Sequence, residues 1–108
     1  MTNAEFQEIL KARLASIETI SGKKDGEYSS NDDRLHVFKE AGRITDTTPE
    51  KALWGMFLKH FVSVQDMVHG RQTPTLGMID EKIGDAILYL IILEAIFKEN
   101  FVEDVAID

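Results

Sequence analysis

Apolar residues recur at helical spacing in four separate stretches of this chain, and no stretch shows the sustained alternation of a half-buried strand. Thr2 and Glu5 stand before the first stretch with the spacing of a capping box, in which each side chain bonds the other residue's backbone N–H. The apolar positions that follow are Phe6, Ile9, Leu10, Leu14 and Ile17. The pattern predicts an amphipathic helix over residues 1–20.

The connection that follows is rich in turn-forming residues. Residues 21–31 contain glycine, aspartate, serine and asparagine, so we expect a loop here. Because this loop is long for a connection between helices, it is either mobile or a functional lid. A second, shorter helix is expected to begin near Asn31 or Asp32, with a buried face made of Leu35, Phe38, Ala41 and Ile44.

Thr48 and Pro49 mark the start of a third helix. Threonine is a preferred N-cap, and proline at the first helical position has no N–H to leave unbonded. The helix is expected to end near Val68, with Gly70 just beyond its end. Apolar residues on the flanks of this helix, such as Trp54, widen its face beyond what one neighbouring helix could cover.

A fourth helix is expected from after Pro74 to about Glu99. Between Ala86 and Leu93 its only polar group is the phenol of Tyr89, which is typical of a helix buried on almost every side. The remaining residues, 100–108, are expected to form an acidic, frayed tail. The wide apolar faces predict an all-α, four-helix-bundle-like fold in which the third and fourth helices form the core of a homodimer.

Length and composition narrow the protein class. A chain of 108 residues is one domain, and the absence of cysteine excludes disulfides and thiolate metal sites and favours the reducing cytoplasm. The chain lacks both a signal-like start and an apolar run long enough to span a bilayer, so no membrane association is expected. A formal net charge of -7 argues against nucleic-acid binding.

A polar stripe enters the apolar part of the fourth helix. Glu81, Asp85 and Tyr89 follow one another at four-residue intervals and therefore share one side of the helix. An ionised carboxylate at the position of Asp85 needs compensation. A divalent cation, a basic partner such as Lys59, or a pocket within the bundle would each provide it. His60, on the apolar face of the third helix, is either a core histidine or part of the same site.

The order of these elements resembles a known family. A turn-rich loop, a short helix, Thr48-Pro49-Glu50 and then the segment Glu81-Lys82-Ile83-Gly84-Asp85 are similar to the all-α NTP pyrophosphohydrolase superfamily, the MazG-like group that includes the dimeric dUTPases. The similarity is greatest to small phage-encoded proteins associated with nucleotide modification. It makes residues 31–99 the MazG-like helical core, and it implies cleavage of an NTP to an NMP and pyrophosphate inside a bacterial or phage-infected cell.

The resemblance also implies roles for individual residues. Glu81, Asp85 and Asp66 would hold Mg²⁺, and Glu81 would be the general base that activates water. Lys59 would neutralise phosphate charge in the transition state. The other residues expected to bind the substrate are Tyr89, His60, Arg34 and His36.

The chain departs from the family pattern in two places. Lys82 stands where a second glutamate is typical, and the third helix has no Glu-x-x-Glu. These departures favour a catalytically degenerate relative that sequesters a nucleotide or binds a host protein. Retention of Glu81 and Asp85 favours a hydrolase, and the sequence leaves both alternatives open.

Overall fold

The chain folds into four helices in a computed structural model that describes residues 1–28 and 33–107. They are α1 (Asn3–Tyr28), α2 (His36–Ile44), α3 (Pro49–Val68) and α4 (Leu76–Ile107). No β-strand occurs in these two ranges, which confirms the all-α class. None of the helices, over the part that is described, is long and apolar enough to cross a bilayer.

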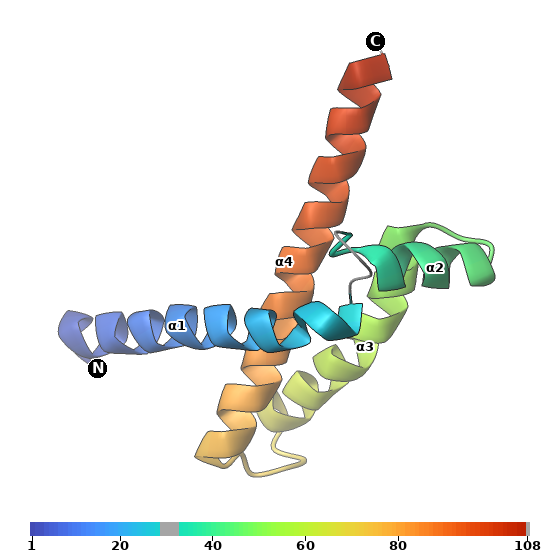
Figure 1. The fold of residues 1–108 in the computed structure, drawn as a ribbon. Helices are drawn as coiled ribbons and strands as arrows, with labels where there is room; N and C mark the ends of the chain where they lie inside the picture. The colour runs from blue at the N-terminus through green and yellow to red at the C-terminus, as the bar shows by residue number, and fades with distance from the viewer. Residues whose placement is uncertain (29–32, 108) are drawn as a thin grey trace.

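The helices α3 and α4 run antiparallel and form the most extensive helix pair of the fold (Figure 1). The short helix α2 packs on α3, and α1 contacts both α4 and α2. Because α1 crosses α4 at a steep angle, its N-terminal half projects away from the other helices (Figure 1). The result is an elongated molecule that measures 49 × 30 × 26 Å.

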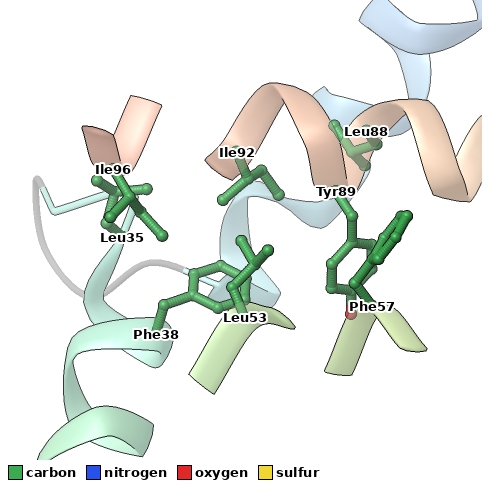
Figure 2. Packing of buried hydrophobic residues seen from close by; sticks show 8 residues of the cluster. All are labelled: Leu35, Phe38, Leu53, Phe57, Leu88, Tyr89, Ile92 and Ile96. Atoms are coloured by element: carbon green, nitrogen blue, oxygen red, sulfur yellow. The ribbon is translucent and has the colours of Figure 1, made fainter. Parts of the chain in front are cut away.

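One apolar cluster joins α2, α3 and α4 (Figure 2). Phe38 of α2 and Leu53 of α3 are fully buried, and the ring of Phe38 meets Tyr89 of α4 edge-on, with 6.4 Å between ring centroids. Burying a side chain of this size stabilises the fold by about 1.5–3 kcal/mol. Beyond these two the cluster contains Leu35, Phe57, Leu88, Tyr89, Ile92 and Ile96.

The predicted start of the first helix and both predicted ends of the third helix are confirmed. The Glu5 N–H donates to Thr2 Oγ1 at 3.1 Å, and the Thr2 N–H donates to Glu5 Oε2 at 3.3 Å, which is the predicted capping box. Thr48 Oγ1 accepts the Lys51 N–H at 3.3 Å, with Pro49 as the first helical residue. Gly70 follows the end of α3 with φ of 71°, in the left-handed region that glycine adopts without strain.

Two predicted boundaries are corrected. Helix α1 continues to Tyr28, so residues 21–28 of the predicted loop are helical, while residues 29–32, including the predicted start of the second helix, lie outside the described part. Extending an existing helix is much easier than nucleating one, and a glycine within it costs only about 1 kcal/mol. Helix α4 similarly runs through most of the predicted tail, to Ile107.

Lys39 connects three parts of the fold through two ion pairs. Its Nζ lies 2.9 Å from Asp33 Oδ2 in the segment before α2 and 2.7 Å from Glu99 Oε1 in α4. The hydrogen bond from Lys39 lowers the pKa of the Asp33 carboxyl, and the bonds to Glu99 and Asp33 raise the pKa of Lys39. All three side chains are more than one third exposed, so solvent screening limits each pair to about 0–1 kcal/mol.

Two glycines offer a matched test of the packing. A Cβ on Gly42 of α2 would lie 2.8 Å from the carbonyl carbon of Thr48 and 3.0 Å from the nitrogen of Pro49, whereas a Cβ on Gly55 of α3 would meet nothing within 4 Å. We expect Gly42→Ala to destabilise the protein by about 1–3 kcal/mol through overpacking. Gly55→Ala should stabilise it by about 0.5–1 kcal/mol, because alanine is the better helix former. Urea unfolding followed by circular dichroism measures both, and an unchanged midpoint for Gly42→Ala would contradict the close contact between α2 and α3.

The Lys39 ion pairs predict a pH-dependent stability difference. A lowered Asp33 pKa adds stability above its ordinary value of 3.8, which is lost as the pH falls through the folded value. A raised Lys39 pKa adds stability below 10.5, which is lost as the pH rises through the folded value. Lys39→Met should therefore cost up to about 1 kcal/mol near pH 7, and the difference from wild type should narrow in acid and in 1 M salt. A difference that is constant over pH 2–7 in urea titrations would rule out this electrostatic origin.

Candidate functional site

An open groove of about 570 Å³ lies where the connection between α2 and α3 meets α3 and α4. Its volume falls within the range of about 300–1,000 Å³ that is usual for small-molecule sites. The residues that line the groove are Thr45, Thr47, Lys51, Ala52, Gly55, Met56, Lys59 and Tyr89.

Two lysines stand on either side of a gap in one wall of this groove. Lys51, Gly55 and Lys59 follow one another at four-residue intervals on α3, so the lysines are about 12 Å apart along the helix axis. Both lysines are exposed, and neither forms an ion pair with a carboxylate among the described side chains. Since nothing lies within 4 Å of a Cβ built on Gly55, the space between the lysines is open.

The turn between α2 and α3 forms another wall and is held by its own hydrogen bonds. Thr45 Oγ1 donates to the Ala41 carbonyl at 2.7 Å, and the Thr47 N–H donates to the Gly42 carbonyl at 2.8 Å. Asp46, between the two threonines, has φ of 54°, a left-handed conformation that aspartate tolerates better than most residues. These contacts fix the side chain of Thr45 and the backbone at Thr47.

Tyr89 reaches the groove from the core, with only 6% of its surface exposed. Its ring lies 4.7 Å from the ring of His60 and 6.4 Å from that of Phe57, measured between centroids. These neighbours pack around the phenol ring and leave little of it for a ligand to stack on. The tyrosine therefore contributes an edge to the groove, while the flexible thioether of Met56 offers an adaptable apolar contact.

His60 is the basic partner of Asp85. Its Nδ1 lies 3.8 Å from Asp85 Oδ2, and both side chains are only 16% exposed. That separation is within range of an ion pair when the imidazole is protonated but is too long for a hydrogen bond. The sequence left open a divalent cation, a basic partner or a pocket to compensate the charge of Asp85. The structure shows a basic partner from α3, and that partner is His60 instead of Lys59.

The three predicted metal ligands are not brought together within one chain. Asp85 faces His60, Asp66 Oδ1 lies 3.4 Å from Arg71 Nη1, and Glu81 has a largely exposed side chain 3.8 Å from Lys82 Nζ. Over the described residues, no three acidic or histidine side chains are arranged to hold a metal ion. Magnesium usually binds one or two carboxylates and takes its other oxygen ligands from waters and substrate phosphates. The described residues of one chain therefore offer no three-residue site of the kind expected from Glu81, Asp85 and Asp66.

The predicted binding residues Arg34 and His36, at the start of α2, lie outside the groove. Arg34 Nη2 donates to the Ser21 carbonyl at 3.3 Å, so this side chain ties the start of α2 to α1. His36 is the first residue of α2, and its N–H donates to the Asp33 carbonyl at 3.3 Å. Neither residue lines the groove.

Of the residues predicted to bind the substrate, Lys59 and Tyr89 line this groove, whereas Lys51, Gly55 and the two threonines were not predicted from the sequence. A usable signal was present, because a glycine in a helix interior with a lysine four residues away on either side leaves a gap between two cations. The threonines gave no such signal, since their position depends on how the turn folds.

Comparison of this chain with family models, with curated proteins and with solved structures finds no match. The groove and its residues are therefore interpreted from their own geometry.

A double-mutant cycle distinguishes the two possible partners of Asp85. The pair His60→Gln and Asp85→Asn should show a coupling energy of about 0.5–1.5 kcal/mol at pH 5–6, since the two groups are in contact. The pair Lys59→Ala and Asp85→Asn should be additive within about 0.3 kcal/mol. Urea unfolding of the single and double variants gives both values. Strong coupling to Lys59 instead would show that the partner of Asp85 has been assigned wrongly.

Proposed function

We propose that this protein binds a nucleotide in the groove, with its phosphates between Lys51 and Lys59. The observation that carries the proposal is the pair of exposed lysines that bracket the gap at Gly55. In a chain with a net charge of -7, two neighbouring cations without a carboxylate partner among the described residues form a local site for an anion.

The remaining walls of the groove suit the other parts of a nucleotide. Ala52, Met56 and the edge of Tyr89 offer apolar contact for a base or sugar. The hydroxyl oxygen of Thr45, whose proton is donated to Ala41, keeps lone pairs that can accept a hydrogen bond from the ligand. Each lysine ammonium carries three donors on a flexible stem, which suits phosphate oxygens whose positions vary.

We further propose that the bound nucleotide is held without turnover. Each of the three carboxylates expected to bind Mg²⁺ has a basic neighbour, and the three do not converge in one chain. This arrangement favours a MazG-like relative that sequesters a nucleotide over a pyrophosphohydrolase. No hydrolytic step is assigned to Glu81 or Asp85.

Calorimetric titration with nucleoside mono-, di- and triphosphates tests the proposal. We expect affinity to rise with the number of phosphates and to fall with added salt. A hydrogen bond to a charged group contributes about 1.5–3 kcal/mol, so Lys51→Ala and Lys59→Ala should each raise Kd about tenfold or more. Gly55→Glu, which places a carboxylate between the lysines, should abolish binding.

Two controls accompany these titrations. Lys11→Ala, which removes an exposed lysine of α1 outside the groove, should leave Kd unchanged. Gly55→Ala should keep the fold and most of the binding. Absence of heat and of a thermal shift with every nucleotide would refute binding in the groove. Magnesium-dependent release of pyrophosphate that Asp85→Asn abolishes would instead establish the hydrolase.

A further inference from the structure

The C-terminal half of α4 carries a second apolar strip beside its core-facing side, and Leu93 at the edge of the strip also packs against the core. Leu90, Leu93, Phe97 and Phe101 recur at intervals of three and four residues and therefore share one face. Leu90 is 49% exposed, Phe97 54% and Phe101 69%. With Glu94 and Lys98 the four residues line a shallow groove of about 520 Å³.

Along the first half of α4, α1 crosses the helix, and Arg13 Nη1 donates to the Asp80 carbonyl at 3.0 Å. Ile9 and Arg13 of α1 line an open pocket together with Leu76 and Ile79, and Leu76 stays 82% exposed. At the strip from Leu90 onwards no other helix contributes to the groove, because all the residues that line it belong to α4. A run of exposed leucine and phenylalanine side chains of this kind marks an interaction surface.

We propose that a second copy of this chain covers the strip, with the two α4 helices antiparallel about a two-fold axis that crosses the strip at the level of residues 95 and 96 along the helix. The strip is symmetric about that point, since Leu90 and Phe101 are almost equally distant from it along the helix, as are Leu93 and Phe97. The axis therefore places Leu90 beside Phe101 of the partner subunit and Leu93 beside Phe97 of the partner subunit. Each contact joins a smaller and a larger side chain, and the surface is complementary to itself.

The charges on this face agree with the same axis. Glu94 and Lys98 form an ion pair within the helix, and they also stand at nearly equal distances on either side of Ala95 and Ile96. An antiparallel pair brings Glu94 towards Lys98 of the partner subunit. A parallel pair would instead place like charges side by side, which disfavours association. This charge pattern is the reason for choosing a second copy over an unrelated protein.

The inferred dimer is independent of the proposed nucleotide, because the strip and the groove share no residue. Four apolar residues per copy make an interface at or below the lower end of the standard range, about 1,200 Å². We therefore expect association in the micromolar range. A host protein on the same strip is the competing outcome.

Sedimentation velocity over about 1–200 μM tests the dimer. The wild-type protein should shift from the 12.2 kDa monomer to twice that mass, and Phe97→Glu and Leu90→Glu should each raise the dimer Kd at least a hundredfold. Phe6→Glu, at a similarly exposed phenylalanine of α1, is the matched control and should keep the dimer. Circular dichroism checks that each variant is folded, and nucleotide affinity should be unchanged in all of them.

Cysteine cross-linking tests the axis itself, since the chain has no cysteine of its own. Leu90→Cys and Phe101→Cys combined in one chain should form interchain disulfides, because the two sites are about 16 Å apart within a helix and cannot join there. Each single variant should stay uncross-linked. A monomer at every concentration, a dimer unaffected by Phe97→Glu, or a single variant that cross-links efficiently would each overturn the proposal.

Discussion

The packing of α4 against α3 through Leu53, Phe57, Tyr89 and Ile92 is the contact on which the rest of the structure depends. Helix α2 buries Phe38 against the same cluster, so its position follows from that of the pair (Figure 2). The pair also places His60 against Asp85, because the two residues lie on facing sides of the antiparallel helices. A change in the rotation of either helix would alter both the core and the groove, since Tyr89 belongs to both.

Local sequence predicted the helix signals well because a cap needs only its own neighbours. Thr2 with Glu5, and Thr48 with Pro49, satisfy N–H groups within one helical turn. The extent of α1 could not be predicted in this way. The turn-forming residues between 21 and 28 disfavour a helix only weakly. Adding residues to a helix that has already formed is favourable enough to overcome that weak preference, so α1 continues to Tyr28.

In the candidate site, too, some features follow from the sequence and others depend on how the helices pack. The structure brings Lys59 and Tyr89 to one groove and His60 next to Asp85, because those residues lie on the facing sides of two long helices. The sequence offered Lys59, not His60, as the basic partner of Asp85. Periodicity could not place Asp66, since a rotation of a few tens of degrees decides whether its carboxylate faces α4 or pairs with Arg71. The contribution of the turn at Thr45 and Thr47 also depends on tertiary structure.

The turn at Asp46 has a consequence for the energetics of recognition. A loop that is ordered only when a ligand arrives must lose conformational freedom at that moment, and an immobilised side chain costs about 0.5–1.5 kcal/mol of affinity. In this protein the hydrogen bonds of Thr45 and Thr47, together with the left-handed Asp46, fix that wall of the groove while the chain folds. The conformational entropy of this wall is therefore lost during folding, and binding has to order mainly the side chains of the two lysines and of Met56.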